Sequence, residues 1–340
     1  MALREPAAGV GLKEITPAMN TQVPISRRDL LKLGVAAPVA AAALAAPAPS
    51  DSSTTIPVTV RDALFRSIGK DDCWSAFREL GADGIEVNVA IDMSLVGMFH
   101  PTVKYNLATP EGIAAFKRDA DARRVSLLTF MMANRFDSRL DDEIAWMKRL
   151  VAACKPLGVR TIRIDLIPEK HAKDEFLPFA IKTGKQISAI AAEEGVRLAI
   201  ENHGNTTNDP GFLEKLFDSV GAANLGLTLE AANFYWYGHP LEEVYGIFHK
   251  FAARAFHAHC KSIKYPEAVK NVRREMGWKY GEHACPIYDG DIDFVRFVRI
   301  LREANYTGDL CLENESLHHF PKDQHVGVLK KEIAHLRRIA

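Results

Sequence analysis

The chain has 340 residues, of which 47% are hydrophobic and 25% are charged, and this composition excludes a fibrous or largely disordered protein. Its 43 basic and 43 acidic residues give a formal net charge of zero, which argues against the basic surface that nucleic-acid-binding proteins present. The five cysteines cannot all pair within the chain, and Cys260 and Cys311 lie in apolar runs, so we expect buried thiols and no disulfide framework.

The first fifty residues differ in composition from the rest of the chain. The basic motif Ser26-Arg-Arg-Asp-Leu-Leu-Lys32 precedes a weakly apolar run at 33–46, an order that is typical of a signal peptide. The paired Arg27 and Arg28 make it resemble a twin-arginine export signal. The alternative interpretation of this segment is an Ala-rich disordered tail. The apolar run 33–46 is too short for a stable membrane anchor, which would need about 20 apolar residues. We therefore expect residues 1–50 to be a signal peptide with a short linker, and the protein to be periplasmic or otherwise exported.

Apolar runs of strand length alternate with helical patterns from about Phe65 to the last residue. In chain order, the runs predict strands at 65–68, 84–90, 126–133, 161–167, 197–204, 225–230, 255–261 and 309–315. The intervening patterns predict helices at 71–80, 110–123, 140–157, 174–194, 210–220, 240–250, 291–304 and 322–338. Eight such pairs over about 275 residues have the length and rhythm of a (β/α)8 barrel. Without an internal repeat or a long linker, residues 60–340 are expected to form one barrel domain.

The last four predicted strands each end in a side chain that can bind a metal ion. Glu201, Glu230 and Glu313 end the fifth, sixth and eighth strands, and His259 ends the seventh. Because the carboxyl ends of barrel strands meet at one mouth, these side chains are expected to lie close together. Three carboxylates and an imidazole suit a hard or borderline divalent cation. The sequence therefore predicts one divalent ion, Mn²⁺, Co²⁺, Mg²⁺ or Zn²⁺, at this mouth.

Six short motifs occur in a characteristic order along the chain, and four of them contain the strand-end residues named above. They are Gly81-Ala-Asp-Gly-Ile-Glu86, Leu-Ala-Ile-Glu201-Asn-His, Thr-Leu-Glu230-Ala-Ala-Asn, His257-Ala-His259-Cys-Lys261, Gly290-Asp-Ile-Asp-Phe294 and Tyr306-Thr-Gly-Asp-Leu-Cys-Leu-Glu313. Together they resemble the sugar phosphate isomerase/epimerase family, which belongs to the xylose isomerase-like TIM barrel superfamily. The resemblance implies that barrel, and it implies Glu201, Glu230, His259 and Glu313 as metal ligands. It also implies that Glu201 and Glu313 act as acid and base on opposite faces of the substrate.

Further polar residues near the mouth are expected to bind substrate. His203 lies on the same side of its strand as Glu201, and Lys261 could either hold an oxyanion or form a loop salt bridge. Asn233 occupies a position that is His in several epimerases of the family. Arg273 lies in the connection 262–290, which is longer than a barrel needs and is expected to cover the catalytic face. The alternative is that this connection, like the long connection 91–108, is a solvent-exposed loop without a role in the site.

Other residues near the strand ends receive weaker predictions. His257 lies deeper in the barrel than His259 and is expected to support a ligand or to belong to the core. Glu86 and Asp165 could point into the mouth, whereas Glu315 lies too far beyond its strand to be a ligand.

These features predict a metal-dependent isomerase or epimerase of a small carbohydrate, a sugar or keto-sugar. A carboxylate would abstract a proton beside a carbonyl, and the metal ion would stabilise the resulting enediolate. One alternative is a lyase or hydrolase of 3-keto-glycosides, and another is a non-catalytic sugar-binding protein. A DNA-repair endonuclease is disfavoured by the neutral charge and by the absence of extra His and Asp ligands. No nucleic-acid partner and no stable membrane anchor are expected, and a homo-oligomer is compatible with the sequence.

Overall fold

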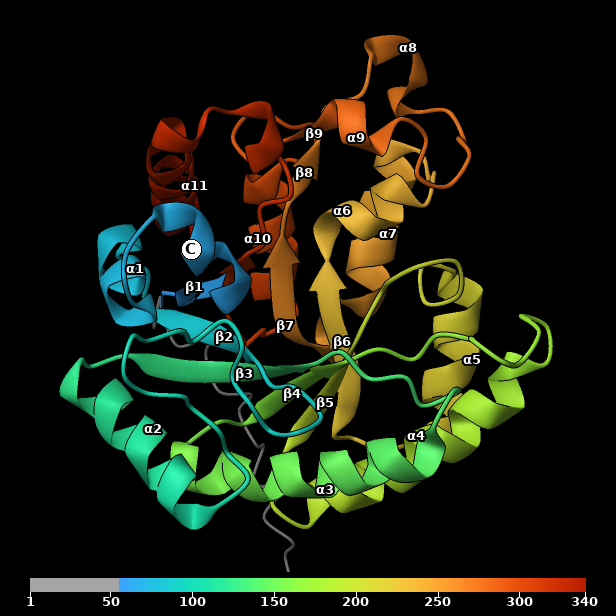
Figure 1. Ribbon diagram of the computed structural model, residues 1–340. Helices are drawn as coiled ribbons and strands as arrows, with labels where there is room; N and C mark the ends of the chain where they lie inside the picture. The colour runs from blue at the N-terminus through green and yellow to red at the C-terminus, as the bar shows by residue number, and fades with distance from the viewer. Residues whose placement is uncertain (1–54) are drawn as a thin grey trace, which may run out of the picture. The chain divides into compact units, whose positions relative to one another are not determined.

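The computed structural model describes residues 55–340, so the predicted signal peptide lies outside the described residues. Within the described range, eight parallel strands close into a barrel in the order β1-β10-β7-β6-β5-β4-β3-β2 (Figure 1). The strands are β1 (Val58–Arg61), β2 (Gly84–Asn88), β3 (Ser126–Met132), β4 (Thr161–Ile164), β5 (Arg197–Glu201), β6 (Leu225–Glu230), β7 (Ala255–Cys260) and β10 (Leu310–Leu312). The predicted (β/α)8 barrel is therefore confirmed.

Helices follow the strands and cover the outside of the barrel (Figure 1). They are α1 (Cys73–Leu80), α2 (Pro110–Ala122), α3 (Leu140–Leu157), α4 (Phe176–Ala192), α5 (Pro210–Val220), α6 (Ala231–Trp236), α7 (Leu241–Phe251), α8 (Glu267–Lys270), α9 (Tyr280–His283), α10 (Phe294–Glu303) and α11 (His325–Ile339). Short 3-10 helices are η1 (Asp62–Ile68), η2 (Ala252–Arg254), η3 (Leu317–His319) and η4 (Lys322–Gln324). None of the helices described within residues 55–340 combines the length and the apolar character that crossing a bilayer requires.

Local sequence signals set the ends of several helices. Thr109 caps α2, because its side-chain oxygen accepts a hydrogen bond from the Gly112 amide at 3.2 Å, and Pro110 occupies the first turn. Helix α3 ends at Gly158, whose φ of 73° is the left-handed conformation that glycine adopts without strain. These signals explain why the predicted bounds of α3 agree with the structure.

The first strand was predicted at the wrong place. Residues 65–68 belong to the 3-10 helix η1, and β1 is instead the preceding segment Val58–Arg61. In β1, Val58 and Val60 are fully buried and alternate with Thr59 and Arg61. Four residues carry too few alternations to be distinguished from a loop, whereas the apolar run that includes Phe65 looked like a buried strand.

The interior of the barrel is polar. Alternation along each strand sends one set of side chains outward, where they are apolar and pack beneath the helices, and the other set inward. Contacts across the barrel, such as that between Glu86 on β2 and His259 on β7, identify the inward set. Its polar members include Thr59, Arg61, Glu86, Thr129, Arg163, Glu201, Glu230, His257, His259 and Glu313. Burying these polar groups costs free energy unless they are paired, so the fold alone does not explain their presence. Their position along the barrel axis therefore points to a functional role.

All five cysteines are free thiols, and all but Cys285 are buried. Burial raises the pKa of the Cys311 thiol to about 12, so it stays protonated at neutral pH. The prediction of buried thiols without a disulfide framework is confirmed for the described residues.

Asp62 and Glu332 are buried carboxyl groups that should make stability depend on pH. Burial raises the pKa of each to about 7, above the ordinary values of 3.8 and 4.5. Their contribution to stability is therefore fully present below about pH 4 and is lost as the pH rises through about 7. We expect the free energy of unfolding, measured by urea denaturation, to fall between about pH 4 and pH 7, and to fall less in Asp62→Asn. An equal fall in that variant would contradict the assignment.

Candidate active site

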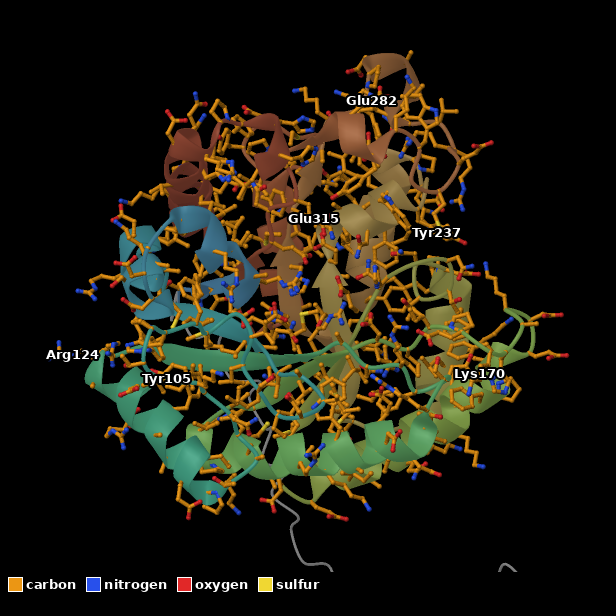
Figure 2. All side chains as sticks on the ribbon, viewed as in Figure 1. Tyr105, Arg124, Lys170, Tyr237, Glu282 and Glu315 are labelled. Carbon is orange, nitrogen blue, oxygen red and sulfur yellow. The ribbon has the colours of Figure 1, made fainter. Side chains whose placement is uncertain are left out.

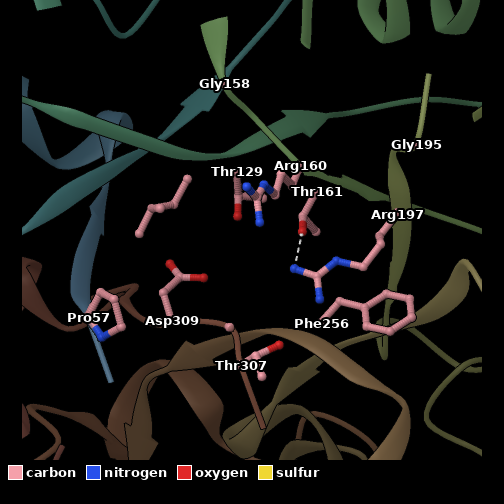
Figure 3. Close-up of a pocket in the computed structure, with 12 residues that line it drawn as sticks. Pro57, Thr129, Gly158, Arg160, Thr161, Gly195, Arg197, Phe256, Thr307 and Asp309 are labelled. Carbon is pink, nitrogen blue, oxygen red and sulfur yellow. Dashed lines mark hydrogen bonds between the residues drawn. The ribbon is translucent and has the colours of Figure 1, made fainter. Parts of the chain in front are cut away.

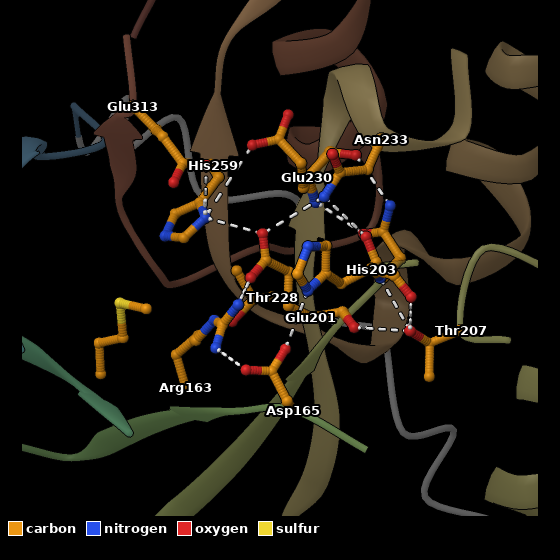
Figure 4. Close-up of polar contacts among 12 residues, drawn as sticks. Arg163, Asp165, Glu201, His203, Thr207, Thr228, Glu230, Asn233, His259 and Glu313 are labelled. Atoms are coloured by element: carbon orange, nitrogen blue, oxygen red, sulfur yellow. Dashed lines mark hydrogen bonds and ion pairs between the residues drawn. The ribbon is translucent and has the colours of Figure 1, made fainter. Parts of the chain in front are cut away.

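The four predicted metal ligands meet at the carboxyl ends of β5, β6, β7 and β10 (Figure 4). One ligand atom of each lies within 4.8 Å of the others, and all four residues are buried. The Nδ1 atom of His259 is 3.4 Å from Glu201 Oε1, 3.3 Å from Glu313 Oε2 and 3.9 Å from Glu230 Oε2. We call this group the four-ligand cluster.

Two arginines orient the outer carboxylates of the cluster. The Arg163 guanidinium pairs with Glu201 Oε2, and the Arg61 guanidinium pairs with Glu313 Oε1. Each carboxylate therefore keeps one oxygen on an arginine and turns the other toward His259 Nδ1. Arginine–carboxylate pairs of this kind restrict the rotamers of both side chains.

Glu230 supplies the third oxygen. Its Oε1 accepts a hydrogen bond from the Ala232 amide at 2.7 Å, and the Asn202 side chain exchanges two hydrogen bonds with its backbone. Its Oε2 is buried and has no hydrogen-bond partner among residues 55–340. Burial raises the pKa of Glu230. An unpartnered buried oxygen that faces three other ligand atoms is the environment that a cation would satisfy.

The two nitrogens of His259 have separate tasks. Nε2 lies 2.9 Å from Glu86 Oε2, so the Nε2–H donates to this carboxylate and the lone pair of Nδ1 faces the cluster. Burial lowers the pKa of His259 to about 4, so the ring is neutral at pH 7, as a metal ligand must be. A carboxylate behind a ligating histidine fixes its tautomer and orientation.

A polar column continues from Glu86 toward the other end of the barrel. Glu86 Oε1 lies 3.5 Å from His257 Nε2, and His257 Nδ1 lies 2.6 Å from Asp309 Oδ1. One ligand atom each of Glu86, His257, His259 and Cys311 also lies within 4.8 Å of the others. In this group Glu86 Oε1 pairs with His257 Nε2, and Glu86 Oε2 pairs with His259 Nε2. His257 thus supports Glu86, and the column fills the barrel axis behind the ligands.

His203 lies at the mouth beside the cluster. Its Nδ1 is 3.2 Å from Asp165 Oδ1, and its side chain is 49% exposed. Asp165 is held in turn by Arg163, whose Nη1 donates to Asp165 Oδ2 at 2.6 Å (Figure 4). The structure therefore places Asp165 at the mouth and leaves His203 within reach of a ligand there.

Asn233 and Lys261 also line the mouth. The Asn233 amide donates to Glu201 Oε1 at 3.3 Å and to the Asn202 carbonyl at 2.8 Å. The buried Lys261 ammonium lies 3.2 Å from both Glu313 Oε2 and Glu315 Oε1. Lys261 is thus a buried part of the mouth with two carboxylate partners, and not a surface loop salt bridge.

The long connection 262–290 folds into a substructure of its own. The antiparallel strands β8 (Ser262–Ile263) and β9 (Ala284–Cys285) form its base, and it carries α8 and α9. The Tyr280 hydroxyl donates to Glu315, so the connection reaches the residues that follow β10. Figure 2 shows Glu315 between the barrel strands and the part of this connection that carries Glu282.

Arg273 is not brought to the four-ligand cluster. Its Nη1 lies 2.6 Å from His239 Nδ1, and its guanidinium lies 5.2 Å from the centre of the Tyr237 ring. The side chain is exposed and packs on the residues that follow α6. The prediction that Arg273 contacts substrate therefore has no support in these contacts, because position within a loop does not reveal how that loop folds.

Arg61 and Arg163 were missed by the sequence analysis. Each lies in a short strand in which the residues pointing to the opposite face are apolar. These residues are Val58 and Val60 in β1, and Ile162 and Ile164 in β4. An arginine at an inward position of such a strand needs a carboxylate partner inside the barrel. That signal could have linked both residues to the predicted ligands.

Three curated proteins show what the sequence is similar to. An inosose dehydratase of Clostridium perfringens is 29% identical over 136 residues, 38% of this chain and 44% of that protein. One from Erwinia tasmaniensis is 24% identical over 258 residues, 70% of this chain and 85% of that protein. An inosose isomerase of Bacillus subtilis is 28% identical over 116 residues, 33% of this chain and 42% of that protein. The matches to the Clostridium and Bacillus proteins thus span less than half of their length.

Solved structures share the fold at low identity. A zinc-bound IolI protein superposes with a TM-score of 0.61 at 17% identity, covering 84% of this chain and 99% of that one. A magnesium complex of a xylose isomerase-like TIM barrel protein from Mycobacterium smegmatis gives 0.60 at 15% identity, with coverages of 84% and 96%. The 3-keto-D-glucoside 4-epimerase YcjR from E. coli gives 0.58 at 12% identity, with coverages of 83% and 99%.

One protein family covers most of the barrel. Residues 74–339 match the family described as xylose isomerase-like TIM barrel. The matched segment begins in α1 and ends with α11. The chain therefore belongs to the xylose isomerase-like TIM barrel family.

Proposed function

We propose that this protein is a divalent-metal-dependent enzyme that isomerises or epimerises a small keto-sugar. One observation carries the proposal: three carboxylate oxygens and His259 Nδ1 converge, while the second oxygen of each carboxylate is held by a protein donor. The oxygen-rich donor set with one imidazole fits Mn²⁺, Co²⁺, Mg²⁺ or Zn²⁺. The zinc and magnesium in the two metal-bound structures of similar fold support the choice of a divalent ion.

When bound, such an ion would polarise a substrate carbonyl and stabilise negative charge on its oxygen. The proton on the adjacent carbon would be taken and returned by Glu201 and Glu313, which lie on either side of His259 Nδ1. Arg163 and Arg61 fix the orientation of these two carboxylates. Asn233 and His203 would hold substrate hydroxyls at the mouth, and Lys261 would hold the Glu313 carboxylate in position.

The curated relatives support a carbonyl-bearing polyol as the substrate class. Two of the three described above are named inosose dehydratases and one an inosose isomerase, and the structural neighbour YcjR is named a 3-keto-D-glucoside 4-epimerase. Because two of these three relatives are named dehydratases, the second candidate is an elimination reaction. It would begin with the same proton abstraction and end with loss of a leaving group, as in the cleavage of a 3-keto-glycoside.

Incubation with inosose or a 3-keto-glucoside in D₂O tests the shared first step. We expect the protein with bound Mn²⁺ to place deuterium on the carbon next to the carbonyl, as mass spectrometry and proton NMR would show. An isomer or epimer as product supports the first candidate, and a dehydrated product or a released aglycone supports the second. Turnover without exchange and without a primary isotope effect at that carbon would refute proton abstraction.

We further propose that the protein is exported through the twin-arginine route. Arg27 and Arg28 precede a weakly apolar run, and this sequence is the support for the proposal. Changing both residues to Lys should leave the precursor in the cytoplasm, as fractionation and immunoblotting would show. Unchanged accumulation in the periplasm would overturn it.

A further inference from the structure

A second cavity lies at the end of the barrel opposite the four-ligand cluster (Figure 3). Its volume is about 590 Å³, within the range of about 300–1,000 Å³ that small-molecule pockets occupy. Thr161 and Arg197, which line it, open β4 and β5, whereas the ligand Glu201 closes β5. The length of the strands therefore separates this amino-terminal cavity from the mouth that holds the ligands.

Short polar side chains leave this space open. Barrels of this kind usually fill their interior with layers of bulky Val, Ile and Leu side chains. Here the inward positions near the amino-terminal end are Thr59, Thr129 and Thr161, of which the last two line the cavity. Their hydroxyl groups offer hydrogen bonds without filling the volume.

Two arginines give the cavity a positive charge. The Arg197 guanidinium is held in place, since it stacks 4.9 Å from the centre of the Phe256 ring and donates to Thr161 Oγ1 at 3.1 Å. Arg160 stands beside it at the exposed rim. Burial lowers the pKa of Arg197, while Tyr306 and Asp309 raise it and repulsion from Arg160 lowers it. Among residues 55–340, no carboxylate forms an ion pair with either guanidinium.

Asp309 is the one carboxylate among the residues that line the cavity. His257 Nδ1 lies 2.6 Å from its Oδ1, and the Thr59 hydroxyl donates to its Oδ2. Both oxygens are thus engaged by groups of the barrel interior, and Asp309 does not pair with the arginines. The cavity combines threonine hydroxyls, the apolar ring of Phe256 and two guanidinium groups that have no ion-pair partner among the described residues.

We infer that the amino-terminal cavity binds a small molecule through an oxyanion group, a carboxylate or a phosphate, held by Arg160 and Arg197. The guanidinium fork matches the geometry of both oxyanions. Thr161 and Thr129 would bind hydroxyl groups of the same ligand, and Phe256 would contact its carbon skeleton. This site is separate from the proposed catalytic site and does not depend on it.

Isothermal titration calorimetry of the full chain, dialysed against chelator and at constant ionic strength, tests the inference. The probes are inorganic phosphate and D-gluconate, whose relative affinities distinguish a phosphate from a carboxylate ligand. We expect saturable binding of at least one probe with a Kd below about 1 mM. Arg160→Gln and Arg197→Gln should each weaken it by about tenfold or more, because each removes a charge-assisted hydrogen bond.

Two control variants locate the binding. Arg118→Gln removes an exposed arginine on α2 and should bind as the unchanged protein does. The Glu201→Gln/Glu313→Gln double variant should also bind normally, because it alters only the opposite mouth. Arg160 is exposed, so its replacement tests the site even if Arg197→Gln fails to fold. Absence of saturable binding for both probes up to about 10 mM would overturn the inference, as would binding that survives both arginine changes or that the double variant abolishes.

Discussion

Replacing Glu313 with Gln is expected to lower the rate of keto-sugar turnover by about 10²–10⁴-fold, because it removes a general base while preserving the shape of the side chain. The change also removes one anionic ligand and leaves the half-buried Arg61 guanidinium with Glu86 as its remaining carboxylate partner. Glu201→Gln should have a comparable effect, and it leaves Arg163 with Asp165 as its remaining carboxylate partner. The measurement is kcat at saturating Mn²⁺ and substrate.

Glu315→Gln is the matched control for these variants. Glu315 is a carboxylate of the same mouth that contacts Lys261 and Tyr280 but does not belong to the four-ligand cluster. Its replacement should lower kcat by less than about tenfold, since the Glu315 side chain is 41% exposed and supplies no atom to the four-ligand cluster. A Glu313→Gln variant with the kcat of the unchanged protein would contradict its role as a base.

Replacing Glu86 with Leu is expected to weaken metal binding by about 10–100-fold, although Glu86 does not face the ligand centre. Glu86 Oε2 accepts the Nε2–H of His259 at 2.9 Å, and this hydrogen bond directs Nδ1 toward the three carboxylates. Glu86→Gln should lose less affinity, because an amide oxygen can still accept the same hydrogen bond. Competition of each variant with a chromophoric chelator for Zn²⁺ measures the affinity.

Glu332→Gln is the control for a general effect of removing a buried carboxyl group. Glu332 lies on α11 and accepts hydrogen bonds from the Ile287 amide and the Asn314 side chain, none of which belongs to the four-ligand cluster. It should therefore bind Zn²⁺ with nearly unchanged affinity. If Glu86→Leu and Glu332→Gln bind Zn²⁺ equally well, Glu86 does not position the histidine.

The strand-end residues could be predicted from the sequence because one rule of geometry connects them. Glu201, Glu230, His259 and Glu313 each follow a buried apolar run, and parallel strands in a barrel bring such ends together. The cost of burying three carboxylates in one place made a metal ion the simplest explanation. The structure adds which atoms converge and shows that Arg61, Arg163 and Lys261 balance these charges.

The partners across the barrel could not be predicted in the same way. The hydrogen bond between Glu86 and His259 joins residues that are 173 positions apart, and its existence depends on the stagger of β2 against β7. The contacts of Arg273 also depend on how the connection 262–290 folds. Arg274, its neighbour, donates hydrogen bonds to the carbonyls of Val269, Tyr235 and His239, and Arg273 itself lies against His239.

The metal content of the purified protein tests the central claim most directly. Elemental analysis should find about one divalent ion per chain after purification without chelator, and almost none in the Glu201→Gln/Glu313→Gln double variant. In crystals of the unchanged protein, an anomalous difference peak should lie between His259 Nδ1 and the facing oxygens of Glu201, Glu230 and Glu313. Equal metal content in the two proteins, or a peak away from these four atoms, would contradict the assignment.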